Sequence, residues 1–94
     1  MRRCYIIVRQ LYYMSNGYPH QIADENPVVA VYTTKTAAVE VVRDIIQNRI
    51  ENSYGKLHSK EGEINSEVVY RLEAYDSLGN SFYAYSVIKM DMIV

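Results

Sequence analysis

The sequence predicts an α+β domain in which a four-stranded antiparallel sheet carries a single helix on one face. Three observations predict this class. Residues 33–52 show the 3.6-residue periodicity of an amphipathic helix, and segments rich in β-branched and aromatic residues stand on both sides of it. The last two of these segments are separated by a short turn, which is typical of a hairpin. One helix between two pairs of strands favours a two-layer domain of the order strand-strand-helix-strand-strand.

Length and composition are those of one small globular domain, residues 1–94. The chain is 49% hydrophobic and 22% charged, and its net charge of −1 argues against a strongly basic nucleic-acid binder. No apolar run approaches the roughly 20 residues of a membrane helix. The chain has one cysteine, Cys4, so no disulfide can form within it. We therefore expect a cytoplasmic protein that has no membrane association.

The first strand is expected at residues 4–13, CYIIVRQLYY, where apolar side chains point to both faces. A strand of this kind is usually central in its sheet. Residues 14–27 follow as a long, mobile loop with turn signals at Asn16-Gly17 and at two prolines, and residues 28–33, VVAVYT, form the second strand. The spatial strand order 2-1-3-4 keeps all neighbours antiparallel and places the first strand inside the sheet.

The helix is expected to begin after a run of threonines, of which Thr33, Thr34 or Thr36 is the N-cap. At 100° per residue, its apolar side chains fall on one half of the cylinder, which is expected to face the core: Ala38, Val39, Val41, Val42, Ile45, Ile46 and Ile50. Gly55 is expected to stop the helix soon after this pattern ends. The polar residues 53–66 are interpreted as a second mobile surface loop.

The C-terminal hairpin joins residues 67–75 to a strand that begins at residue 81. Asp76 suits the start of a type I turn and Gly79 suits a left-handed residue, so Asp76 is expected to pair with Asn80. Counting outward from this turn predicts a register with the cross-strand pairs Glu73–Tyr83, Arg71–Tyr85, Val69–Val87, Glu67–Lys89, Leu72–Ala84, Tyr70–Ser86 and Val68–Ile88.

Tyrosine is the unusual residue, with ten Tyr against one Phe and no Trp. In the predicted register the more apolar face lies under the helix and comprises Leu72, Ala74, Phe82, Ala84 and Ile88. The opposite face carries tyrosines, and a single helix cannot cover it. We expect this open face and the C-terminal strand to form an association surface of residues Arg71, Tyr75, Tyr83, Tyr85, Val87 and Met92.

Two alternatives remain for the tyrosine face. Tyrosines are good strand formers whose hydroxyls tolerate water, so the face can simply be hydrated. It can also serve as a platform on which nucleic-acid bases stack against Tyr83 and Tyr85 beside Arg71. The C-terminal residues 90–94 leave a similar choice. They form an unpaired strand end that invites another strand, or they pair with Ile64-Asn65 or pack under the helix.

No catalytic, metal or cofactor site is expected. His20 and His58 fall in predicted loops, and the acidic residues near them lack the spacing of zinc or calcium ligands. Cys4 lies on a strand without an activating motif. The passage VYTTKTAAVEVV, an aromatic-ended strand running into a Thr-capped helix, is similar in style to small proteins of bacteria, their phages and mobile elements. That likeness implies an accessory or inhibitor-type binder.

The function expected from these observations is a non-enzymatic protein-interaction domain. The chain is expected to form a homodimer or to bind another protein. One form of the second possibility is a phage or mobile-element protein that inhibits a host protein. Nucleic-acid binding through the Tyr/Arg face is the alternative from a different class.

Overall fold

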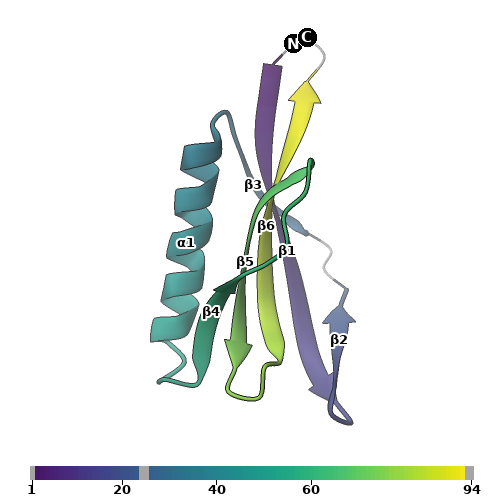
Figure 1. Ribbon diagram of the computed structural model, residues 1–94, viewed down its shortest axis with the longest axis vertical. Helices are drawn as coiled ribbons and strands as arrows, with labels where there is room; N and C mark the ends of the chain where they lie inside the picture. The colour runs from purple at the N-terminus through teal and green to yellow at the C-terminus, as the bar shows by residue number, and fades with distance from the viewer. Residues whose placement is uncertain (1, 24–25, 93–94) are drawn as a thin grey trace.

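The computed structural model describes residues 2–23 and 26–92 and confirms the α+β class, with one helix packed on one face of an antiparallel sheet (Figure 1). The described residues form a sheet of six strands, so the prediction of four is wrong. The elements in chain order are β1 (Arg2–Ser15), β2 (Tyr18–Ile22), β3 (Val28–Tyr32), α1 (Lys35–Glu51), β4 (Leu57–Glu61), β5 (Val68–Asp76) and β6 (Ser81–Met92).

The strand order is β2-β1-β6-β5-β4, and β3 also pairs with β1. As predicted, the first strand is interior and every pairing is antiparallel. The predicted order 2-1-3-4 is wrong, because β6 and not β5 lies beside β1. β1 and β6 are the two longest strands, and pairing them side by side satisfies more backbone groups than pairing β1 with the shorter β5.

Both segments interpreted as long loops contain strands. Asn16 and Gly17, with φ of 54° and 79°, form a two-residue turn between Ser15 and Tyr18, and β2 folds back along β1. Positive φ at both central residues is the type I′ geometry that Asn-Gly favours. Within residues 53–66, β4 pairs with β5 as an exposed edge strand. The structure therefore places two short strands, β2 and β4, in these segments.

The turn of the β5–β6 hairpin is as predicted. The backbone N–H of Asp76 donates to the carbonyl of Asn80 at 2.9 Å, and Gly79 has a φ of 86°. The Oδ1 atom of Asp76 accepts hydrogen bonds from the backbone N–H groups of Leu78 and Asn80. The far end of the hairpin also keeps the predicted register, since the Lys89 N–H donates to the Glu67 carbonyl at 2.8 Å.

The register between these two ends is shifted by one residue. Tyr75 pairs with Ser81 but Ala74 pairs with Tyr83, which leaves Phe82 as an extra residue on β6. Val69 is the extra residue on β5 and restores the register beyond it. Two compensating bulges thus enclose a stretch in which the predicted pairs are wrong, for example Leu72 facing Tyr85 instead of Ala84. A one-residue shift moves every side chain of one strand to the other face relative to its partner.

The shift places the tyrosines of β6 beneath the helix. Tyr85 is 2% exposed and Val87 is fully buried, and both belong to the core that α1 closes. Tyr83 packs against the same core, and the Arg49 guanidinium of α1 lies 4.8 Å from the centre of its ring. The buried core consists of Ile7, Ala38, Val42, Ile46, Leu72, Ala74, Tyr85 and Val87. Leu72 and Ala74 are under the helix as predicted, whereas Ala84 and Ile88 are on the opposite side.

The helix itself agrees with the prediction. Its buried residues are Ala38, Val42 and Ile46, and the other four apolar residues of the predicted face pack at the edge of the core. Among the three candidate threonines Thr34 is the N-cap, because its hydroxyl oxygen accepts the Ala37 N–H at 3.2 Å.

Replacing Thr34 by Ala is expected to lower the free energy of unfolding by about 1 kcal/mol, since the Ala37 N–H loses its acceptor. Urea unfolding followed by circular dichroism measures the change. The matched control is Thr33→Ala, which removes an exposed threonine one residue earlier and is expected to change stability by less than about 0.5 kcal/mol. Equal losses in the two variants would contradict the assignment of the cap.

Candidate interaction surface

The sheet face opposite α1, called the open face here, carries an apolar patch. Ile7 is buried under the helix, so its neighbours Ile6 and Val8 point to the open face, together with their cross-strand partners. The patch comprises Ile6, Val8, Val28, Val31, Val68, Ile88 and Met90. Val28, Val31 and Met90 are each about half exposed, and the other members are half-buried. The patch runs across β3, β1, β6 and the start of β5.

A polar cluster lies beside the patch on β4, β5 and β6. The Nη1 atom of Arg71 donates to the Ser86 hydroxyl at 2.8 Å, and its Nη2 atom lies 3.2 Å from the Glu73 carboxylate. The Lys60 ammonium is 4.0 Å from the same carboxylate and 5.0 Å from the centre of the Tyr75 ring. Two cations therefore share one carboxylate, and the cluster keeps a net positive charge.

A glycine supports the position of the Arg71 side chain. The backbone N–H of Gly62 donates to the Arg71 carbonyl, and a Cβ atom at residue 62 would lie only 2.6 Å from Cδ of Arg71. The arginine therefore lies flat across the backbone of Gly62, with its guanidinium held between Glu73 and Ser86. This arrangement keeps the Arg71 charge on the open face in one defined position.

The residues predicted to form the surface are divided between the two faces. Arg71 and Tyr75 are on the open face, as predicted. The predicted position of Tyr83, Tyr85 and Val87 on the open face is wrong. The bulges of the hairpin turn these side chains under α1. The backbone of Met92 pairs with Arg2, but its side chain lies outside the part of the chain that the structure describes.

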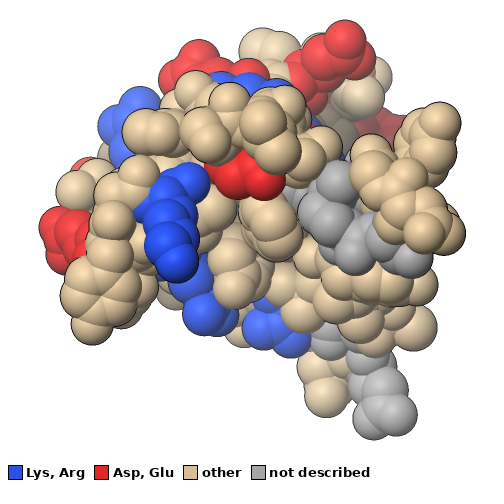
Figure 2. Space-filling view, turned by 90° about the horizontal axis from the view of Figure 1, so that it is seen from below, with Lys and Arg blue, Asp and Glu red and all other residues tan. Residues whose placement is uncertain are grey.

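The residues proposed to stack nucleic-acid bases also lie on opposite faces of the sheet. Tyr83 and Tyr85 pack toward the helix, whereas Arg71 points to the other side of the sheet, so the three cannot form one stacking platform. On the end of the molecule shown in Figure 2, acidic groups lie mostly in the upper and left parts of the view, and basic groups also occupy its middle and lower parts.

The C-terminal strand is paired inside the chain. β6 lies between β1 and β5, and Met90 faces Cys4, so the predicted unpaired strand end and its pairing with Ile64-Asn65 are both wrong within the described residues. The outer edges of the sheet are different strands. β4 carries charged side chains at Lys60 and Glu61, which discourage pairing with another chain, whereas β3 is VVAVY and carries none.

The sequence contained a signal for the apolar patch. The first strand was predicted to be apolar on both faces, and a strand of that kind is covered twice in a folded assembly. The chain offers one amphipathic helix, which covers only one of those two faces. Ile6 and Val8 are on the other face, whereas Ile7 is under the helix.

Titratable residues outside the polar cluster form contacts that stabilise the fold. His20 stacks on Tyr13 with ring centres 5.2 Å apart. Cys4, on the same side of β1 as Ile6 and Val8, is buried. The Arg43 Nε donates to the Tyr70 hydroxyl at 3.3 Å, and this hydrogen bond raises the pKa of Arg43 further above neutrality.

Among the residues that the structure describes, no three His, Cys, Asp or Glu side chains lie together as metal ligands. No described helix has the length and apolar character needed to cross a membrane.

No protein family model, curated protein or solved structure matches this chain.

Proposed function

We propose that the chain is a non-enzymatic interaction domain that self-associates through its open face. The observation that carries this proposal is the apolar patch, whose valines on β3 are half exposed on a sheet face that α1 does not cover. Leaving apolar side chains in contact with water costs about 25 cal/mol per Å². A second layer on the open face removes that cost and gives β1 an apolar neighbour on each side.

A second copy of the chain suits this face because the face is self-complementary. A two-fold interface brings the same patch of each subunit together, so a patch dominated by charges of one sign would repel itself. Here Glu73 pairs with Arg71 inside each copy, and the remaining positive charge, that of Lys60, lies on the edge strand β4 outside the apolar patch. The valines and isoleucines of the apolar patch carry no charge and can therefore meet their equivalents.

The apolar patch also extends across most of the sheet, over β3, β1, β6 and the start of β5. Two such sheets would pack face to face at a spacing of about 10 Å, with both helices on the outside.

Size-exclusion chromatography with light scattering at two concentrations, such as 10 and 200 μM (about a twentyfold range), tests the proposal. We expect a species of twice the 10.9 kDa mass of the chain, and its proportion should increase with concentration. A mass of one chain at both concentrations would rule out self-association. Because Cys4 is buried and free, the same mass is expected with and without a reducing agent.

A further inference from the structure

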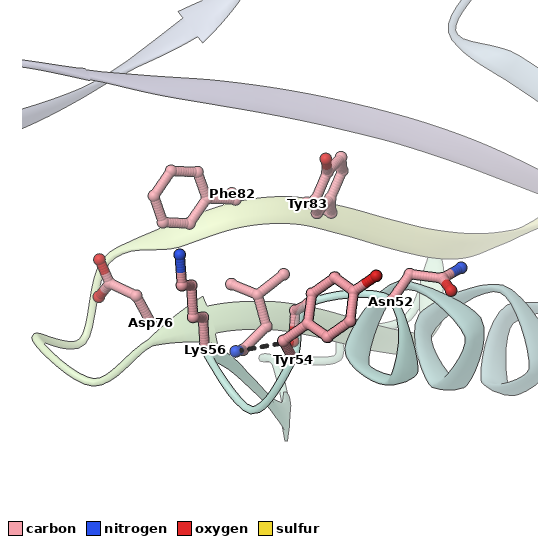
Figure 3. Close-up of a pocket in the computed structure, with 8 residues that line it drawn as sticks. Asn52, Tyr54, Lys56, Asp76, Phe82 and Tyr83 are labelled. Carbon is pink, nitrogen blue, oxygen red and sulfur yellow. Dashed lines mark hydrogen bonds between the residues drawn. The ribbon is translucent and has the colours of Figure 1, made fainter.

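A hollow of about 510 Å³ lies between the C-terminal end of α1 and the turn that joins β5 to β6 (Figure 3). It is separate from the apolar patch. Its lining residues are Asn52, Ser53, Tyr54, Lys56, Leu57, Asp76, Phe82 and Tyr83. Phe82 and Tyr83 approach from β6, and Tyr54 and Lys56 approach from the connection between α1 and β4.

The aromatic wall of the hollow is a product of the β6 bulge. Consecutive residues of a regular strand point to opposite faces, so Phe82 and Tyr83 would ordinarily be separated. Phe82 is the extra residue of the bulge, and bulges redirect side chains. As a result both rings line the same hollow, with Leu57 completing the apolar surface.

Tyr54 stands at the rim in a conformation that tyrosine rarely adopts. Its φ is 55° and that of Gly55 is 80°, and the Lys56 N–H donates to the Ser53 carbonyl at 3.2 Å, which closes a tight turn. A left-handed conformation costs a residue with a Cβ atom about 1–2 kcal/mol, and Asn or Gly is the usual choice at this position. The tyrosine is 94% exposed, so packing within the chain does not compensate for the strain. Uncompensated strain of this kind is characteristic of functional positions.

The charges around the hollow favour an anion. Lys56 lines it, and the Arg49 guanidinium lies over the Tyr83 ring. In the part of the chain that the structure describes, neither cation belongs to an ion pair. The one carboxylate at the hollow, Asp76, accepts two backbone N–H groups of its own turn at 2.9 and 3.0 Å. Both bonds are made by Oδ1, so this oxygen is held toward the backbone of its own turn.

We propose that this hollow binds a planar aromatic carboxylate. The ring of the ligand lies against Phe82 and Tyr83, Tyr54 covers it from the rim, and the carboxylate pairs with Lys56. Stacking on aromatic side chains provides the affinity for the ring, and the ammonium group selects the charge. The proposal is independent of self-association, because the open face contributes none of these residues.

The test uses 2-naphthoate as the probe and follows backbone amide shifts by NMR. We expect shifts confined to residues 52–57, 76 and 82–83, and binding at least tenfold weaker for cyclohexanecarboxylate, which has the charge without the flat ring, and for 2-naphthylmethylamine, which has the ring with the opposite charge. Shifts centred on the open face, or equal binding of the three compounds, would overturn the proposal.

Two variants test the roles of single residues. Tyr54→Asn is expected to weaken naphthoate binding at least about fivefold while raising the melting temperature by about 4 °C or more, because Asn tolerates the left-handed conformation. Tyr18→Asn removes another exposed tyrosine, on β2, and is expected to leave binding unchanged. Lys56→Gln is expected to weaken naphthoate but not the uncharged 2-naphthalenemethanol. Undiminished naphthoate binding by both Tyr54→Asn and Lys56→Gln would refute the assigned site.

Discussion

Replacing Tyr85 by Ser is expected to lower the free energy of unfolding by about 3–5 kcal/mol, the range for truncating a buried aromatic side chain. Tyr85 is 2% exposed and lies in the core between the sheet and α1. Serine leaves a cavity there and places a hydroxyl group among apolar core side chains. For a domain of this size the loss corresponds to a decrease in melting temperature of about 12 °C or more, which calorimetry or circular dichroism measures directly.

Tyr85→Phe is the matched control for this variant. No hydrogen bond involves the Tyr85 hydroxyl within the described part of the chain, and no buried side-chain oxygen or nitrogen there lacks a partner, so the hydroxyl reaches solvent. The phenylalanine variant is therefore expected to stay within about 1 kcal/mol of the parent. If Tyr85→Ser keeps the parental stability and only reduces the mass in solution, then Tyr85 is on the open face and the bulged register is incorrect.

The helix was predictable because its signal is local and redundant. Seven apolar residues at helical spacing define the half that faces the core. If any one of them were changed, the remaining six would still predict a helix. The turn at residues 76–80 was predictable for a similar reason, since Asp76 and Gly79 each satisfy a specific geometric requirement. Both elements are determined by residues close together in the sequence.

The faces of the hairpin were not predictable from that turn. A register counted outward from a turn assumes that no residue is skipped, and Phe82 and Val69 each violate this assumption. The bulges cancel, so both ends of the hairpin have the expected pairs and only the middle differs. What decides between the alternatives is tertiary packing: the shifted register places Val87 and Tyr85 with Ile7 under α1, and that gain does not depend on local sequence.

The two strands missing from the prediction, β2 and β4, differ in how strongly the sequence indicates them. Asn16-Gly17 between apolar runs is the strongest short-range hairpin signal, and β2 could have been predicted from it. β4 has the sequence LHSKE and resembles a loop, because an edge strand is protected by the same charged residues that are typical of loops. The location of the apolar patch depends on the turn between β1 and β2. At this turn the chain folds back along β1, and β3 then pairs with β1 so that Val28 and Val31 lie next to Val8 and Ile6.

Replacing Val31 by Glu is expected to raise the dissociation constant of the proposed homodimer at least about 100-fold. Val31 is 56% exposed beside Ile6 on the open face, so in the homodimer its side chain would enter an apolar contact. A carboxylate in that contact loses water without gaining a partner, and charges at the centre of an interface cost several kcal/mol. Light scattering at 200 μM (about twenty times the lower concentration used for the parent) is then expected to give the mass of one chain.

Leu78→Glu is the matched control, because Leu78 is also an exposed apolar residue but lies in the β5–β6 turn. It introduces the same charge into the same chain and is expected to preserve the dimer. Both variants should unfold within about 1 kcal/mol of the parent when all are compared as monomers at low concentration, since neither side chain belongs to the buried core. A Val31→Glu protein that remains fully dimeric would show that the copies meet through another surface, and loss of the dimer in both variants would show that added negative charge alone prevents association.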